Sequence, residues 1–208
     1  PLAYRYLKEN EDRIKENVQC REGVMWHTFT REHNQSMYDV DKIIIPMTAK
    51  DTIATYISNR GLYMDNANVW FITIPNADSK IMKAITCVIN STVFSVLGKA
   101  GANPQTGEYY KFNKQFLTPI PFPSVKLTAD SGAVLYLSSI FDEITELQDR
   151  YLVATQNQKE VFTRALKEKW SDLDEVCFNL YEVTDVEKAQ IQAIGRTISR
   201  IDLLNGAE

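Results

Sequence analysis

Short runs of β-branched and aromatic residues, separated by turn residues, occupy the chain up to residue 75. Before them, residues 1–17 place a few apolar side chains among many charges, which predicts a short polar helix. The later runs are bounded by Gly, Asn, Asp or Pro and therefore predict strands. These predicted strands are residues 24–29, 42–47, 53–57 and 69–74.

The spacing of apolar residues becomes helical after residue 78. Apolar side chains from 79 to 97 cover most of the circumference of a helix, so we expect this helix to be buried against the sheet, with Ser79 as its cap. A three-and-four repeat from 130 to 169 predicts a long helix with room for a break near Gln156. Two capping boxes of the form S/T-x-x-acid, at Ser171 and Thr184, predict two shorter helices.

Together these elements predict an α+β fold. We expect a mixed β-sheet with a packed helix, followed by the long helix and the two shorter helices. The corresponding domains are an α/β domain at residues 1–126 and a helical spacer or docking segment at 127–208.

The composition is that of an ordinary globular protein, with 44% hydrophobic and 24% charged residues among 208. No apolar run approaches the roughly 18 residues of a membrane helix, and no leader pattern precedes the first helix. Three scattered cysteines form no CxxC pair, which favours free thiols over disulfides or zinc. We therefore expect a cytoplasmic protein, and Pro1 in place of an initiator Met fits an excised fragment.

The net charge of −4 is distributed unevenly along the chain. Residues 79–126 carry six lysines against one acidic residue, whereas residues 127–208 carry eight basic and fifteen acidic residues. The middle of the chain can therefore face a polyanion, and the acidic helices after it would be repelled by phosphates.

Common catalytic signatures are missing from the sequence. It has no GxGxxG, GxxxxGK[ST], HExxH or GxSxG motif. His27 and His33 are six residues apart and lack an evident third ligand, so they do not indicate a metal site. We expect no active site and no metal site in this chain.

A series of short motifs follows in order along nearly the whole chain. They are Pro1–Leu7 (PLAYRYL), Trp26 with Arg31 and Asn34, Lys42–Pro46 (KIIIP), Asp65, Ile89–Ser91 (INS), Tyr110–Phe112 (YKF), Pro119–Pro121 (PIP), and Leu173–Thr184 (LDEVCFNLYEVT). This order resembles the C-terminal target-recognition domain of TaqI-like adenine-specific DNA methyltransferases and of fused type IIG restriction–modification enzymes. The sequence departs from the family at Glu182, where the family usually has Gly.

The resemblance implies a non-catalytic, sequence-specific DNA recognition domain of a bacterial N6-adenine DNA methyltransferase, with or without a fused endonuclease. The family's catalytic domain carries an N-P-P-[YF] motif and a glycine-rich cofactor loop, and this chain has neither. S-adenosylmethionine would therefore bind a separate catalytic domain of the parent chain. The implied partners are that domain and double-stranded DNA, which must be gripped beside the catalytic cleft while the target base is flipped.

A reader of duplex DNA needs cations for phosphates and side chains with paired donors and acceptors for base edges. The loop from Lys99 to Lys111 supplies both, and the loops near the predicted strands offer a second set. Our base-contact candidates are Asn103, Gln105, Arg31, Asn34, Gln35 and Arg60. Our phosphate-contact candidates are Lys99, Lys111 and Lys114.

Other interpretations of the same residues remain open. The loop can be a plain connection, the lysines can simply be solvated, and Arg31 and Arg60 can pair with Glu32 and Asp65. One alternative function is a protein-interaction module that docks a partner on its long helix without binding DNA. Another is an enzyme fragment with an unrecognised site.

Overall fold

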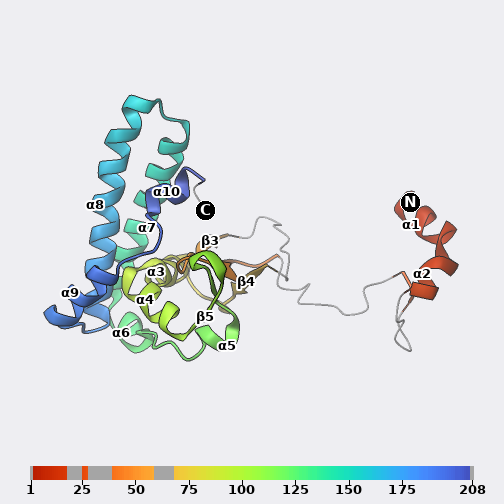
Figure 1. Ribbon diagram of the computed structural model, residues 1–208, viewed down its shortest axis with the longest axis horizontal. Helices are drawn as coiled ribbons and strands as arrows, with labels where there is room; N and C mark the ends of the chain where they lie inside the picture. Colours follow the sequence, from red (N-terminus) through yellow and green to blue (C-terminus); the bar gives the residue numbers. More distant parts are fainter. Residues whose placement is uncertain (1, 18–24, 28–38, 59–67, 207–208) are drawn as a thin grey trace. The chain divides into compact units, whose positions relative to one another are not determined.

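The computed structural model describes residues 2–17, 25–27, 39–58 and 68–206 and has an α+β fold (Figure 1). It divides into two units, Pro1–Tyr38 and Asp39–Glu208, and each is described by itself. The boundary predicted at 126/127 does not coincide with this division, because the elements on both sides of it belong to the second unit.

The first unit contains two short helices, α1 (Leu2–Glu9) and α2 (Glu11–Asn17), where one polar helix was predicted. Opposite charges stabilise the pair, because the ammonium groups of Lys8 and Lys15 both pair with the carboxylate of Glu11. The same two ammonium groups lie 5.8 and 5.9 Å from the ring centroid of Trp26. The two helices confirm the prediction of a helical N-terminal segment.

The strand predicted at residues 24–29 does not form in the part that the structure describes. Of the described residues 25–27, Trp26 and His27 lie in a turn. Their rings contact each other edge to face with centroids 5.1 Å apart, and the His27 ring also contacts Tyr4 of α1 with centroids 5.4 Å apart, so these aromatic residues pack the turn against the helix.

The second unit begins with a three-stranded sheet of order β3-β1-β4, made by β1 (Lys42–Pro46), β3 (Thr55–Ile57) and β4 (Val69–Ile72). Both neighbours of β1 run antiparallel to it. Three of the predicted strands are thus confirmed. Every strand pairing described in this sheet is antiparallel, where a mixed sheet was predicted.

A second antiparallel sheet has the order β2-β6-β5. Its strands are β2 (Thr48–Ala49), β5 (Asn103–Pro104) and β6 (Tyr110–Lys111). The segment that the sequence predicts as a loop is therefore a hairpin, with the short 3-10 helix η2 (Thr106–Glu108) at its tip.

Two helices replace the single one predicted at 79–97: α3 (Ser79–Asn90) and α4 (Thr92–Gly101), bent by 63°. The break falls at Ser91, whose extended backbone ends α3 and whose hydroxyl accepts from the Phe94 N–H to cap α4. The cap of α3 is Asp78 and not the predicted Ser79, because the Asp78 carboxylate accepts from the Lys80 N–H.

Two long helices, α7 (Ser131–Val153) and α8 (Gln156–Leu180), lie side by side in Figure 1. The predicted break in the long helix is confirmed, but it falls just before Gln156. The predicted helix start at Ser171 is wrong, because Ser171 lies inside α8. Between α4 and α7 the chain forms the short helices α5 (Lys114–Leu117) and α6 (Ser124–Ala129).

The capping box at Thr184 is confirmed. The Thr184 hydroxyl accepts from the Glu187 N–H, and the Glu187 carboxylate accepts from the Thr184 N–H, at the start of α9 (Asp185–Ile194). A last short helix, α10 (Arg200–Leu204), follows.

One core joins the first sheet to the long helices. Its buried side chains come from β1, α3, α4, α7 and α8, and they include Ile43, Ile45, Met82, Val88, Phe94, Leu137, Ile140, Leu166 and Leu173. Among the described residues, no single helix is long and apolar enough to cross a membrane, although the bent pair α3 and α4 passes that test jointly. Most of the apolar side chains of these two helices are buried in this core.

Helix α8 ends in a turn where Glu182 has a positive φ of 53°. The Val183 N–H donates to the Phe178 carbonyl and the Glu182 N–H donates to the Asn179 carbonyl, which is a Schellman motif. Glycine fits the left-handed position of this motif best, and the resembled family usually has glycine there. The structure thus gives a physical reason for the family's residue at this position.

We expect Glu182→Gly to raise the free energy of unfolding by about 0.5–1 kcal/mol, because it relieves the left-handed backbone of a residue with a Cβ. Urea denaturation would measure the change. Glu182→Gln is the matched control, because it removes the exposed ion pair with Lys126 and leaves the backbone conformation unfavourable. Equal stability of the Gly and Gln variants would contradict the prediction.

Candidate nucleic-acid interface

The sheet β2-β6-β5 has one outward face. Lys111 lies opposite both Thr48 and Asn103, and residues directly opposite in a ladder project to the same face. All three of these residues are exposed. The next ladder position contains Ala49, which is buried, Tyr110, which is half-buried, and Pro104, which is exposed, so the other face is covered at β2 and β6 but not at β5.

Lys50 and Gln105 directly follow strands β2 and β5, and Tyr109 directly precedes β6, so these three residues border the outward face. The Lys50 ammonium lies 5.3 Å from the ring centroid of Tyr109, and the Gln105 N–H donates to the Tyr109 carbonyl at 2.7 Å. We call this surface the hairpin face. It consists of Thr48, Lys50, Asn103, Gln105, Tyr109 and Lys111.

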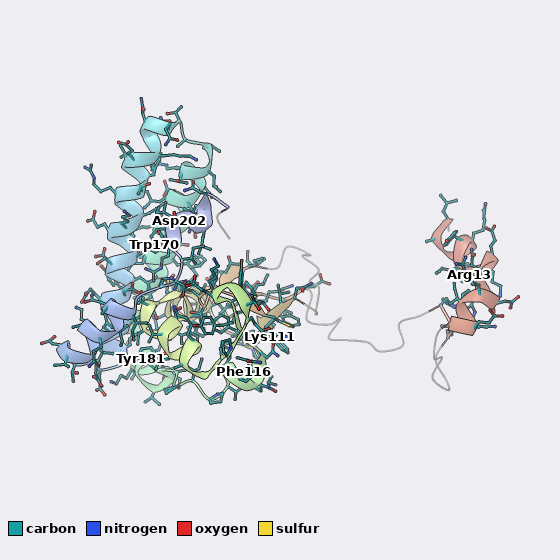
Figure 2. The ribbon with its side chains drawn as sticks, in the orientation of Figure 1. Arg13, Lys111, Phe116, Trp170, Tyr181 and Asp202 are labelled. Carbon is teal, nitrogen blue, oxygen red and sulfur yellow. The ribbon has the colours of Figure 1, made fainter. Side chains whose placement is uncertain are left out.

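The motif Tyr110-Lys111-Phe112 fixes the orientation of the hairpin. The rings of Tyr110 and Phe112 stack with centroids 6.2 Å apart, and Phe112 is completely buried. The Phe112 N–H donates to the Met47 carbonyl at 2.8 Å. Lys111, between the two aromatic residues, therefore points outward. Figure 2 shows Lys111 on the side of the second unit away from the part of α8 that carries Trp170.

A close approach of α4 supports the buried base of the hairpin. A Cβ at Gly98 would lie 2.9 Å from Thr52 Cγ2 and 3.4 Å from the Phe112 ring. Glycine at this position lets the helix pack directly against Phe112, so the hairpin rests on a rigid element.

The tip of the hairpin is exposed from Asn103 to Glu108. Gly107 and Glu108 both have positive φ, 75° and 65°. The Gln105 side chain donates to the Pro104 carbonyl at 2.9 Å, which leaves its amide oxygen as an acceptor. The tip thus presents polar side chains on a defined turn.

The lysines of this region keep their charge available. Within the described ranges, Lys50, Lys111 and Lys114 form no ion pair with an acidic side chain, and Lys111 and Lys114 are exposed. Lys114 begins α5, just after the hairpin. These three cations give the hairpin and its surroundings the electrostatic character that a phosphate contact requires.

Lys99 has a different environment from the other predicted phosphate contacts. Its ammonium lies 2.7 Å from the carboxylate of Asp51, which is buried, and 3.1 Å from the Thr197 hydroxyl. Its side chain is only 11% exposed. Lys99 therefore neutralises a buried acid.

Four predicted base contacts, Arg31, Asn34, Gln35 and Arg60, lie outside the described residues and stay predictions. Asp65, part of the family resemblance, also lies outside them. Of the predicted set, the structure brings together Asn103, Gln105 and Lys111. The sequence analysis missed Thr48 and Lys50, although the alternation Thr48-Ala49-Lys50 after a strand is a weak signal for one outward face.

A buried polar network lies where α3 meets α4, and it explains the motif Ile89-Asn90-Ser91. The Asn90 amide accepts from the Ala54 N–H and donates to the Ala54 carbonyl, both at 2.8 Å. Arg196 donates to the carbonyls of Asn90 and Thr52. The motif therefore joins helix, sheet and C-terminal segment and has no exposed base-reading role.

Asp51 is the acidic centre of this network. Its carboxylate accepts from the Ser95 hydroxyl at 2.9 Å and from the Ile198 N–H at 2.9 Å, besides pairing with Lys99. Burial by itself would raise the pKa of Asp51, but the bonds from Lys99 and Ile198 and the charge of Arg196 outweigh it and hold the pKa below its usual value.

Asp174 caps helix α4 from the neighbouring helix α8. Its carboxylate accepts from the Thr92 N–H at 2.7 Å and from the Thr92 hydroxyl at 2.8 Å, and Arg200 donates to both of its oxygens. Burial, and secondly the charge of Arg200, lower the pKa of nearby Arg196 to about 10. The family-like segment at Leu173 thus has a structural role.

A hollow of about 820 Å³ lies between β3, α3, α7 and the C-terminal segment. The positively charged side chains that line it have partners: Lys83 pairs with Asp142, Arg200 with Asp174, and Arg196 with backbone carbonyls. The Nε of Arg196 is buried and has no hydrogen-bond partner among the described residues. Within the described residues, no three His, Cys, Asp or Glu side chains gather closely enough to hold a metal ion.

No family model and no curated protein matches this sequence.

Proposed function

We propose that this chain is the sequence-specific DNA recognition part of an adenine-specific DNA methyltransferase or of a fused restriction–modification enzyme. The chain is non-catalytic in this proposal, and methyl transfer from S-adenosylmethionine belongs to a separate domain of the parent enzyme. The observation that carries the proposal is the hairpin face, where amide and lysine side chains project together from a sheet supported by α4.

The chemistry of the hairpin face matches the requirements of duplex DNA. The major groove admits a two-stranded β-ribbon, and Asn and Gln amides pair with the N6 and N7 edge of adenine. Lys50, Lys111 and Lys114 supply charges for the phosphates beside the groove. The ordered resemblance to target-recognition domains led to the same proposal.

The long helices complete the proposal as a docking surface for the parent enzyme's catalytic domain. Three apolar side chains near the α7–α8 connection are strongly exposed: Leu152 by 59%, Val153 by 86% and Val161 by 67%. Leu152 and Val153 are neighbours at the end of α7, and neighbouring exposed apolar side chains favour a protein contact. The excess of acidic residues after residue 126 makes these helices unsuitable for a DNA contact.

Salt dependence of duplex binding tests the proposal. Three lysine–phosphate contacts give a log–log slope of the association constant against salt of about −2.7, and further contacts would steepen it. Fluorescence anisotropy of a labelled duplex at about 50 to 200 mM salt measures this slope. Absence of duplex binding at low salt would overturn the proposal.

The alternative function is a protein-interaction module whose long helices dock a partner without DNA. The exposed side chains of Leu152, Val153 and Val161 are the observation that favours it. The same binding experiment distinguishes the two functions, because a helix pair that docks a protein has no salt-dependent affinity for duplex DNA.

A further inference from the structure

The hollow between β3, α3, α7 and the C-terminal segment is lined by two residues with unpaired N–H groups, Trp170 and Arg196. The indole Nε1 of Trp170 and the guanidinium Nε of Arg196 are buried, and neither has a hydrogen-bond partner among the described residues. Trp170 as a whole is only 7% exposed. A buried donor without an acceptor costs free energy, so an acceptor brought by a ligand would recover that loss at both positions.

Contacts with Arg200 bring the two donors into one cluster. The guanidinium groups of Arg196 and Arg200 both donate to the carbonyl oxygen of Asn90, at 3.1 and 2.8 Å. The guanidinium carbon of Arg200 lies 5.8 Å from the ring centroid of Trp170. Trp170, Arg200 and Arg196 therefore follow one another along the same hollow, which all three line.

The positive charge of this cluster is only partly paired. Arg200 pairs with Asp174 at 3.0 Å, whereas Arg196 donates to two backbone carbonyls and forms no ion pair within the described ranges. Burial and then the charge of Arg200 lower the pKa of Arg196 to about 10, although Asp51 and Asp174 act in the opposite direction. An anion in contact with Arg196 would favour its charged form.

The rest of the lining indicates the body of the ligand. A hollow of about 820 Å³ has the size of a small-molecule site. Two acids, Asp142 and Asp149, also line it, but Lys83 neutralises Asp142, and Asp149 is exposed to water, which screens its charge. The apolar and aromatic side chains of the lining are those of Tyr56, Phe141, Ile144, Leu173, Leu203 and Leu204.

We infer that this hollow binds a small organic monocarboxylate with an apolar or aromatic body, whose carboxylate accepts hydrogen bonds from Trp170 Nε1 and Arg196 Nε. A carboxylate has lone pairs for both donors, and its single charge matches the one guanidinium of the cluster that has no carboxylate partner. A phosphate would bring further charge with no free cation to match it. Both nitrogens are covered by neighbouring atoms, so binding includes a movement of lining side chains. The site is additional to the proposed function and does not depend on it.

Titration of the full 208-residue chain with phenylbutyrate, followed by NMR, tests the inference. Phenylbutanol is the matched neutral probe, because it has the same body without the carboxylate. The chain has three tryptophans and therefore three indole N–H signals, which substitution of each tryptophan by Phe assigns. The backbone amide signals of β3, which lines this hollow, locate the probe.

We expect the indole N–H signal of Trp170 to move downfield and to saturate at millimolar phenylbutyrate, since so small a probe binds weakly. Phenylbutanol should leave this signal in place. Trp170→Phe keeps an aromatic ring beside Arg200 but removes the donor. It should therefore weaken phenylbutyrate binding roughly 10- to 100-fold, as followed at the β3 amides.

Trp70→Phe is the matched control for this substitution. The Nε1 of Trp70 is also buried and unpaired, but Trp70 lies in β4 and does not line the hollow. An unpaired indole is thus no sign of a ligand by itself, and the variant should bind phenylbutyrate as the wild type does.

Four results would overturn the inference. They are an unmoved Trp170 signal, equal movement with both probes, wild-type affinity of Trp170→Phe, and shifts at Gln192 with none at β3. The last result would place the probe in a neighbouring hollow of about 320 Å³, which Trp170, Arg196 and Gln192 line. If Trp170→Phe does not fold, the wild-type titration decides, because the variants at Trp26 and Trp70 assign the remaining signal to Trp170. The salt dependence of duplex binding tests the proposed function separately.

Discussion

Replacing Asp51 with Ala is expected to lower the free energy of unfolding by about 3–5 kcal/mol, because the buried Lys99 ammonium would lose its counter-charge. The Ile198 N–H and the Ser95 hydroxyl would lose their acceptor in the same substitution. An unsatisfied buried donor adds its own cost. Urea denaturation of the wild type and the variant measures the difference.

Asp142→Ala is the matched control for this prediction. Asp142 also pairs with a lysine, Lys83, but its side chain is 58% exposed, so the expected loss is below about 1 kcal/mol. The double variant Asp51→Ala with Lys99→Met should recover part of the loss, because both buried charges are then removed. If Asp51→Ala lowers the free energy of unfolding no more than Asp142→Ala does, the prediction that Asp51 is central to the network is wrong.

The same carboxylate predicts a loss of stability in acid. The pKa of Asp51 is lower in the folded chain than its ordinary value of about 3.9, so the folded state favours the ionised form. Its contribution is complete above that ordinary value and disappears as the pH falls through the lower folded-state pKa. The stability difference between wild type and Asp51→Ala should therefore shrink below about pH 4.

Reversing the charge of Lys111 and Lys114 together should weaken duplex binding roughly 30- to 100-fold at 0.1 M salt, because two of the three proposed phosphate contacts are lost. The slope of the salt dependence should fall from about −2.7 to about −0.9. Fluorescence anisotropy with Lys111→Glu/Lys114→Glu measures both quantities.

The control for this double reversal is Arg164→Glu/Lys167→Glu on α8. Both residues are exposed, and the net charge changes by the same amount. A general repulsion between protein and DNA would weaken the two double variants equally, whereas a local contact weakens only the first. Equal affinities of the wild type and the Lys111/Lys114 variant would place the phosphate contacts elsewhere.

The regular elements were predictable where periodicity extends over several residues. The strand at Lys42–Pro46 and the helices α7 and α8 follow directly from apolar spacing. Strands β2, β5 and β6 have two residues each, too few to show a period, and they exist because of pairing between distant segments. The break at Ser91 was missed because its hydroxyl and backbone begin a second helix in an otherwise continuous apolar pattern.

The candidate interface was predictable in part, for a similar reason. Composition pointed to Asn103, Gln105 and Lys111, but their common orientation depends on the register with Thr48. Lys99, unlike Lys111, forms an ion pair with Asp51. Asp51 is distant in the sequence, so a count of charges along the chain does not reveal this pair. Buried polar networks of this kind depend on tertiary structure, and a sequence motif such as Ile89-Asn90-Ser91 does not show which groups it joins.

The hairpin face has a consequence for protein engineering. Its side chains come from two stretches of chain, Thr48–Lys50 and Asn103–Lys111, that meet only in the folded sheet. If only the second stretch were exchanged for that of another protein, foreign strands would have to pair with the native β2 and pack against the native Phe112. A transplant that alters which DNA is recognised should therefore carry both stretches together, along with the glycine of α4 on which they rest.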